Sequence, residues 1–156
     1  MQDLAAVAAV EAMCFPPAEA ATEKDFAGRI QHYGNHFWLM FDGDRLIAFV
    51  DGFVTDEADL TDEMYANAAM HNENGAWQMI FGVNTLPAYL KQGYAGELIR
   101  EAIRTAKNQG RKGLVLTCKD RLVPYYAKFG FVNEGKSMSK LGGAVWYDMR
   151  LVFEEL

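Results

Sequence analysis

Residues 83–96 read VNTLPAYLKQGYAG and separate a long apolar run from a strongly periodic one. The run before them, residues 76–86, has apolar residues at both odd and even positions, which predicts a central sheet strand with a bulge at Gly82. The stripe that follows recurs at helical spacing and consists of Ala95, Leu98, Ile99, Ala102, Ile103 and Ala106. Gly110 then provides a C-terminal stop for the predicted helix.

The turn at residues 91–96 has the properties of an anion site. A helix N-terminus offers unpaired N–H groups and the positive end of the helix dipole, and Gly93 lets the backbone approach a ligand closely. Lys91 adds a mobile positive charge. A diphosphate group fits this arrangement. The alternative interpretation is that Gly93 only permits a tight strand-to-helix turn.

Changes of period along the rest of the chain predict an α/β fold. The expected elements are helices over residues 3–15, 22–32 and 122–129 and strands over residues 36–41, 46–54, 113–118, 131–139 and 144–153. Pro16 ends the first helix, and Thr22 with Asp25 forms a capping box for the second. Residues 55–75 form a long acidic connection of a kind that is usually functional or mobile. We therefore predict a single domain over residues 1–156, with a central mixed β-sheet flanked by about four helices.

Two pairs of these strands are expected to be antiparallel. The strands over 36–41 and 46–54 flank the turn Asp42-Gly43-Asp44, which predicts a hairpin. The last two strands are expected to pair across Gly142-Gly143 and to complete the sheet.

The composition argues against several classes of function. A protein that binds a phosphate backbone needs clustered Lys and Arg, so the formal net charge of −6 predicts no nucleic-acid partner. No apolar stretch approaches the roughly 20 residues of a membrane helix. The N-terminus carries Asp3 and Glu11 and lacks the basic region of a signal peptide. We therefore expect a cytoplasmic protein with no membrane partner.

The cysteines and histidines form no metal-binding pattern. Cys14 and Cys118 lie far apart in the sequence, which predicts buried, reduced thiols. His32 and His36 are expected at the surface near a loop, and no carboxylate or cysteine spacing beside them supports a metal site. The sequence therefore predicts no bound metal.

Several segments, taken in order, resemble one family. Residues 83–95 are similar to the acetyl-CoA signature of the GNAT acetyltransferases, whose core reads Q/R-x-x-G-x-G/A. Residues 114–119 and 125–131 resemble the next strand and helix of that family. With residues 60–63 and 146–149 they are most similar to its arylalkylamine (serotonin) N-acetyltransferase branch. The resemblance covers nearly the whole chain and implies the GNAT fold, acetyl-CoA as cosubstrate and transfer of the acetyl group to an amine.

The resemblance also implies roles for individual residues. Backbone groups around Val83 to Thr85 would polarise the thioester carbonyl and bind the pantetheine arm, and Tyr126 would protonate the CoA thiolate. The implied cofactor-binding residues are Val83, Thr85, Lys91, Gln92, Gly93, Tyr94, Ala95 and Gly96. From the sequence alone, Tyr126 is equally well a half-buried aromatic residue on its helix.

The chain departs from the family pattern at three places. Leu90 stands where the motif has Gln or Arg, which removes one side-chain contact to the pyrophosphate. The chain begins almost at its first helix, so the family's first strand is expected to be missing, through a shorter sheet edge or a truncated start. The two histidines of the arylalkylamine branch correspond to Met79 and Phe81, which together with Trp77 predict an apolar wall in the acceptor pocket.

The general base therefore has to be sought elsewhere. The candidates are Glu19, Asp51, Glu63 and His71. For Asp51 the alternative is a strand residue that faces solvent, and for the last two it is a solvated loop. A water chain or deprotonation in bulk solvent would need none of the four. Pro16-Pro17 and the 55–75 connection are expected to close over the acceptor.

Several functions stay open at this point. The first is N-acetylation of a small primary amine, aromatic amines included. A variant of this function is acetylation of a protein N-terminus or a lysine side chain. The second is a catalytically silent module that binds acyl-CoA. A flavin or nucleotide binder on a Rossmann sheet is disfavoured, because the glycine turn lies mid-chain after an antiparallel hairpin. The sequence leaves a homodimer open.

Overall fold

The computed structural model describes residues 3–153 and confirms the predicted α/β fold. Its α-helices are α1 (Leu4–Cys14), α2 (Glu23–Tyr33), α3 (Asp62–Ala66), α4 (Tyr94–Asn108) and α5 (Val123–Ala127). Its strands are β1 (Phe37–Asp42), β2 (Arg45–Asp51), β3 (Val54–Thr55), β4 (Trp77–Ile80), β5 (Gly82–Thr85), β6 (Gly113–Cys118), β7 (Val132–Lys136) and β8 (Tyr147–Val152). Short 3₁₀ turns connect several of these elements.

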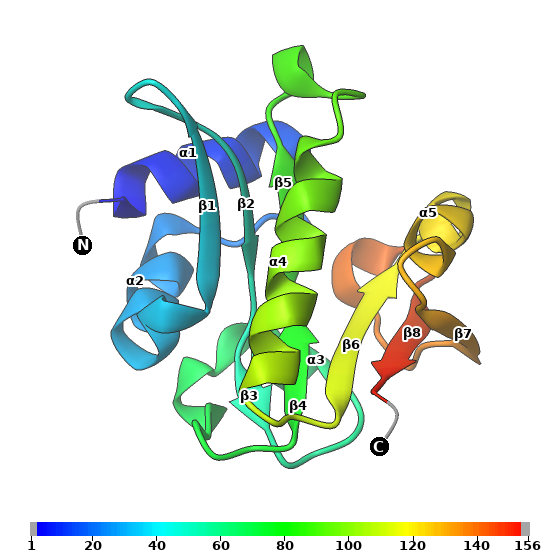
Figure 1. Cartoon of the computed structure of the whole chain (residues 1–156). Helices are drawn as coiled ribbons and strands as arrows, with labels where there is room; N and C mark the ends of the chain where they lie inside the picture. The colour runs from blue at the N-terminus through cyan, green and yellow to red at the C-terminus, as the bar shows by residue number, and fades with distance from the viewer. Residues whose placement is uncertain (1–2, 154–156) are drawn as a thin grey trace.

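The strands form two sheets instead of one continuous sheet. One sheet has the order β1-β2-β5 and is antiparallel, and the other has the order β3-β4-β6-β8-β7, in which only β4 and β6 are parallel. Figure 1 shows that β5 and β6 diverge above β4, and that α4 runs along the front of the molecule. The predicted mixed sheet is therefore present, but it divides where β4 passes into β5.

Two predicted strands, 76–86 and 46–54, are each broken in two by a close backbone approach. At Gly52, between β2 and β3, an added Cβ would lie 1.8 Å from the carbonyl oxygen of Met79. At Gly82, the first residue of β5, an added Cβ would lie 2.9 Å from Nδ2 of Asn84. Glycine is the residue that permits such close approaches. At Gly82, where a bulge was expected, the chain passes from one sheet to the other.

Helices cover both faces of the β1-β2-β5 sheet. On one face, Phe49 of β2 packs edge-to-face against Phe26 of α2, and α1 lies beside α2. On the other face, the indole N–H of Trp38 donates to Thr105 of α4 at 3.3 Å. The capping box of Thr22 and Asp25 is confirmed by both of its hydrogen bonds. The apolar stripe predicted for α4 is confirmed: Leu98, Ile99, Ala102 and Ala106 are buried, and the helix packs against strands of both sheets.

The C-terminal region corrects two further predictions. The last two strands are shorter than expected, and the predicted turn at Gly142-Gly143 is part of a longer segment, residues 137–146. Asp62 of α3 accepts hydrogen bonds from Ser139 and Lys140, which holds this segment away from the strand ladder. The helix predicted over 122–129 is limited to α5 and follows a 3₁₀ turn. Among residues 3–153, no helix is long and apolar enough to cross a lipid bilayer.

We expect Gly52→Ala to destabilise the protein by about 2 kcal/mol or more, because the added methyl group forces the backbone of β4 to move. Urea unfolding measures this loss. Gly28→Ala is the matched control, since nothing lies within 4 Å of an added Cβ at this helical position. The control should stabilise the protein by about 0.5–1 kcal/mol, through the better helix propensity of alanine. Equal stability of the two variants would contradict the close approach at Gly52.

Candidate active site

Strand β5 leaves one edge free of other strands. In the described sheets it pairs only with β2, while its predecessor β4 pairs with β6. The N–H of Leu86 donates to Ile47 of β2 at 2.8 Å, and hydrogen bonding alternates along an antiparallel pair. The backbone groups of Val83 and Thr85 therefore face the free edge. The carbonyl of Thr85 accepts a hydrogen bond from the thiol of Cys14 at 3.3 Å and none from β2.

The free edge leads directly to the turn before α4. Gly93 is the N-cap of this helix and has a φ of 83°, in the left-handed region that favours glycine. Lys91 also has a positive φ, 63°, which is uncommon for a residue with a side chain. No side chain caps the helix, so the N–H groups of its first turn, at Tyr94, Ala95 and Gly96, point outward without partners in the helix. This geometry forms an anion cradle.

The side chains around the turn differ in their exposure. Lys91, Gln92 and Gly93 are exposed, whereas Gly96 is buried with its Cα close to the ring of Phe129. An added Cβ at Gly96 would lie 3.3 Å from that ring, so glycine lets the start of α4 pack against the end of α5. Leu90, which replaces the polar residue of the motif, is 54 % exposed and has no polar atom to offer an anion. Anion binding at this turn therefore depends on backbone N–H groups and Lys91.

Tyr126 lies on α5, which follows the C-terminal end of β6. Its ring is buried between Tyr125 and Phe131, with centroid distances of 5.2 Å and 6.2 Å. Burial raises the pKa of Tyr126, and the nearby Cys118 adds to the shift, so the hydroxyl stays protonated at neutral pH. Within residues 3–153 this hydroxyl makes no hydrogen bond, which leaves its proton available to a ligand.

The acidic base candidates differ in what surrounds them. Glu19, in the connection between α1 and α2, forms an ion pair with Lys119 at 2.9 Å, and its side chain is 7 % exposed. Asp51 is completely buried at the end of β2 and forms an ion pair with Arg29 at 3.2 Å, so the alternative of a solvent-facing strand residue is wrong. Glu63 is exposed on α3 and, in the described part of the chain, makes no hydrogen bond or ion pair. Of these three, Asp51 lies directly against Gly82.

The three apolar residues on β4 and at its end also have different surroundings. Met79 is fully buried in a core cluster with Tyr33 and Phe53. Trp77 lies at the start of β4, where the guanidinium of Arg150 stacks on its ring at 4.7 Å. Phe81 is half-buried at the division between β4 and β5. Only Phe81 of the predicted wall is therefore at the end of β4 that adjoins the free edge.

Comparison with known proteins agrees with this geometry. The sequence profile described as "Acetyltransferase (GNAT) family" matches residues 4–131. The chain belongs to the GNAT acetyltransferase family. Serotonin N-acetyltransferase of Mesocricetus auratus is 27 % identical to it over 111 residues, which cover 70 % of this chain and 52 % of that protein. The chain thus spans about half the length of this curated relative.

Solved structures share the GNAT fold with this chain at low sequence identity. The GphF GNAT-like decarboxylase in complex with isobutyryl-CoA has a TM-score of 0.83 at 16 % identity, covering 97 % of this chain and 95 % of that one. The ribosomal-protein-S18-alanine N-acetyltransferase from Escherichia coli has a TM-score of 0.72 at 18 % identity, covering 100 % and 91 %. A GNAT family acetyltransferase from Brucella melitensis, solved with acetyl-CoA, has a TM-score of 0.61 at 19 % identity, covering 99 % and 84 %.

The GNAT domain also contains a buried polar cluster that the sequence analysis missed. It lies on the α1–α2 face of the sheet beneath Gly82 and comprises Glu11, Arg29, Tyr33, Asp51 and Asn84. A signal was present in the sequence, because Glu11 occupies a position on the apolar stripe of the first predicted helix. A carboxylate at such a position is buried, and a buried carboxylate needs partners or a role.

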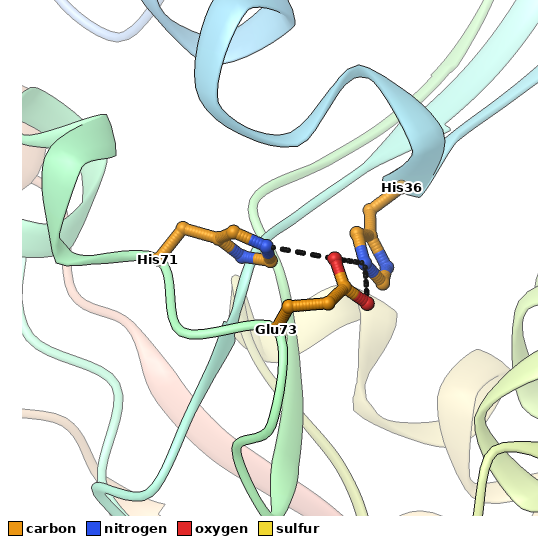
Figure 2. Close-up of side chains that lie close together, drawn as sticks. All are labelled: His36, His71 and Glu73. Carbon is orange, nitrogen blue, oxygen red and sulfur yellow. Dashed lines mark hydrogen bonds and ion pairs between the residues drawn. The ribbon is translucent and has the colours of Figure 1, made fainter.

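A second cluster corrects the prediction for His36. His32 is exposed as expected, but His36 is fully buried and lies with His71 and Glu73 in the arrangement that Figure 2 shows. The Nε2 atoms of both histidines are 3.0 Å from the Glu73 carboxylate, and His36 Nδ1 is 3.0 Å from Oε1 of Gln78. Gln78 donates to backbone carbonyls through its amide nitrogen, so its oxygen accepts from His36. These contacts draw His36 into the interior.

The same cluster offers three ligand atoms within 4.8 Å of one another, the only such group among residues 3–153. The N–H of Val54 donates to Nδ1 of His71 at 3.0 Å, so the proton of the neutral ring is on Nε2. That proton points to Glu73, and His36 likewise donates to Glu73 through Nε2. These hydrogen bonds join the three residues into a clamp between the start of β1 and the segment before β4.

Burial raises the pKa of Glu73, but hydrogen bonds from His36, His71 and Asn35 outweigh it and lower the pKa to about 2. A carboxyl group whose pKa is lowered in the folded state stabilises the fold at pH values above its ordinary pKa of 4.5. This stabilisation disappears as the pH falls towards 2. We expect Glu73→Gln to reduce the free energy of unfolding at pH 6 and to differ much less from the wild type near pH 2.5. Urea unfolding over this range measures the difference. Glu63→Gln is the control and should follow the wild type at both pH values.

Proposed function

We propose that this GNAT chain, as a single domain over residues 1–156, transfers the acetyl group of acetyl-CoA to a primary amine, with a small amine, aromatic amines included, favoured over a peptide. The observation that carries the proposal is the continuity between the free edge of β5 and the turn at Gly93. Together they present the backbone groups of Val83 and Thr85 and the N–H groups of the first turn of α4, at Tyr94, Ala95 and Gly96, along one path. An extended chain of amides that ends in a diphosphate matches this path in shape and in hydrogen bonding.

The residues along this path divide the work of binding. The pantetheine arm adds to the edge of β5 as an extra strand would, with Val83 and Thr85 as its backbone partners. The pyrophosphate binds at the start of α4 through Lys91, Gln92, Gly93, Tyr94, Ala95 and Gly96. Leu90 has no polar atom for this binding. The backbone N–H groups therefore supply the hydrogen bonds to which a Gln or Arg side chain would otherwise contribute.

The chemistry then needs few side chains. The amine nitrogen attacks the carbonyl carbon of the thioester, and the N–H groups at the start of β5 stabilise the negative charge that develops on oxygen. The carbon–sulfur bond breaks, and Tyr126 gives its proton to the leaving thiolate. The hydroxyl is protonated at neutral pH and makes no hydrogen bond within residues 3–153, so it is free to face the sulfur.

The acceptor end of the site favours a small amine over a peptide. The ion pair of Glu19 with Lys119 joins the α1–α2 connection to the end of β6, and the ammonium of Lys119 lies over the ring of Trp146 at 5.5 Å. An added Cβ at Gly142 would lie 2.5 Å from Glu19, so the 137–146 segment also closes on this point. A peptide substrate needs an open groove here. Acetylation of a protein N-terminus or lysine is therefore the second candidate.

The test is to incubate the protein with acetyl-CoA and a panel of amines and peptides, to follow thiol release, and to measure CoA binding by calorimetry. We expect thiol release with small amines and CoA binding that Gly93→Ala weakens about tenfold, since alanine disfavours the left-handed turn. Gly43→Ala is the matched control, because Gly43 also has a positive φ and free space around it but lies in the β1–β2 turn. It should leave CoA affinity unchanged.

The possible results separate the candidates. Turnover only with peptides would favour the second candidate. CoA binding without turnover of any acceptor would indicate a silent acyl-CoA-binding module, and absence of CoA binding would contradict the proposed site altogether.

Tyr126→Phe should lower kcat by at least about tenfold and leave the affinity for CoA unchanged, because only the proton of the hydroxyl is removed. Tyr125→Phe is the control: its ring packs against Tyr126 but belongs to no step of the reaction, so kcat should stay within about twofold of the wild type. Steady-state kinetics at saturating acetyl-CoA measure both. Full activity of the Tyr126 variant would remove the general acid from the mechanism.

A further inference from the structure

The polar cluster beneath Gly82 combines side chains from four elements that are distant in the sequence. Its members are Glu11 of α1, Arg29 and Tyr33 of α2, Asp51 of β2 and Asn84 of β5. Each of these residues is at most 6 % exposed. Such a concentration of buried polar groups is unusual in an otherwise apolar core and calls for a physical explanation.

Several atoms of the cluster do have partners. Arg29 donates to Asp51 Oδ2 at 3.2 Å and to the carbonyl of Tyr65 at 3.1 Å, and the N–H of Ala21 donates to Glu11 Oε2 at 2.9 Å. Among residues 3–153, six further buried atoms make no close hydrogen bond: Glu11 Oε1, Arg29 Nε, Tyr33 Oη, Asp51 Oδ1, Asn84 Oδ1 and Asn84 Nδ2. The Tyr33 hydroxyl faces the Asp51 carboxylate and the Asn84 amide faces Glu11, so these groups point toward one another. Because each such atom costs about 1–3 kcal/mol when left unpaired, their gathering indicates a site for a polar guest or a water molecule.

The free atoms converge on the point where the two sheets divide. From the position of an added Cβ at Gly82, the distances are 2.9 Å to Asn84 Nδ2, 3.0 Å to Asp51 Oδ1 and 3.6 Å to Glu11 Oε1. The next residue along β5 is Val83, which the proposed function assigns to the thioester end of the pantetheine. One residue of a strand spans about 3.3 Å, so the cluster lies next to the reacting carbonyl.

The charges of the cluster single out Glu11. Arg29 stays protonated and neutralises one carboxylate, which is Asp51 at 3.2 Å. The second carboxyl group, Glu11, forms no ion pair with any residue of the described part of the chain. Burial raises its pKa to about 7, the negative charge of Asp51 adds to the shift, and the N–H of Ala21 and the charge of Arg29 oppose it. Burial also raises the pKa of Tyr33 and of the Cys14 thiol, so both stay neutral near pH 7.

We propose that Glu11 is the general base of the reaction and takes the proton of the acceptor ammonium over one water molecule held by Asp51 and Asn84. This inference rests on the proposed function. The ammonium loses one proton to the Glu11 carboxylate, and the free amine nitrogen then bonds to the thioester carbon as the carbon–sulfur bond breaks. The attacking nitrogen then loses its second proton to solvent, the leaving thiolate takes the proton of Tyr126, and the Tyr126 phenolate takes a proton from solvent, so that one proton in total is released per turnover. Glu11 returns its proton to solvent before the next turnover.

The test compares the pH dependence of kcat/KM in the full chain for the wild type, Glu11→Gln and Glu11→Asp with an alkylamine acceptor. The wild type should show an inflection near pH 7. Glu11→Gln should lose about 100-fold at pH 7.5, and its kcat/KM should rise with pH without an inflection up to pH 9. In that variant only amine deprotonated in bulk reacts, and an alkylamine has a pKa of about 10. Glu11→Asp keeps a carboxyl group and should keep an inflection at a lower rate.

Three controls separate catalysis from structure. Calorimetry should give the same CoA affinity for all variants. Glu19→Gln removes an enclosed acid that lies outside the cluster and should retain the inflection near pH 7. With a weakly basic aromatic amine, which is already unprotonated at neutral pH, the loss in Glu11→Gln should be much smaller than with the alkylamine.

Each contrary result has a distinct meaning. An unchanged pH profile in Glu11→Gln overturns the role of Glu11 and leaves the proposed function intact. A loss that is uniform over pH and equal for both acceptors shows a structural role and also overturns the inference. A wild type that binds no CoA, or turns over no amine, overturns the proposed function and the inference with it.

Discussion

The division between β4 and β5 is the constraint on which the rest of the structure depends. Up to Ile80 the chain bonds to β6, and from Gly82 onward it bonds to β2. The N–H of Phe81, which donates to Asp51 at 2.8 Å, marks the crossing. One strand cannot follow two diverging neighbours without a bend, and Gly82 permits that bend. The free edge of β5 is a direct consequence, since the strand that bordered it has turned away.

The same division creates the buried polar cluster. Where the two sheets diverge, Gly82 carries no side chain, and polar side chains from α1, β2 and β5 lie close to its Cα. The free edge and the cluster are therefore two sides of one feature. The edge offers N–H groups to an acyl donor on one side, and Glu11 with its neighbours approaches from the helices on the other side.

Membership of the GNAT family accounts for the cofactor half of this arrangement more fully than for the acceptor half. In our proposal the groups that bind the pyrophosphate at the Gly93 turn are mostly backbone atoms, so Leu90 in place of the usual polar residue removes only a side-chain contact. Met79 on β4 and Phe81 directly after it stand at the positions that correspond to the histidines of the arylalkylamine branch, and Met79 is buried in the core. In our proposal the carboxylate of Glu11 on α1 is the general base, in place of histidines on the central strand. The base then comes from a helix instead of a strand, but it lies in the same part of the domain.

The sequence alone determined the features that depend on neighbours along the chain. The capping box of α2, the β1–β2 hairpin, the stripe of α4 and the glycine turn are all confirmed, because caps, turn residues and periodicity act within a few residues. Only the tertiary structure decided the division of the sheet, the burial of His36 and the cluster around Glu11. Each of these arises from contacts between distant segments, as between Gly52 and Met79 or between His36 and Glu73, and no local pattern encodes which distant segments will meet.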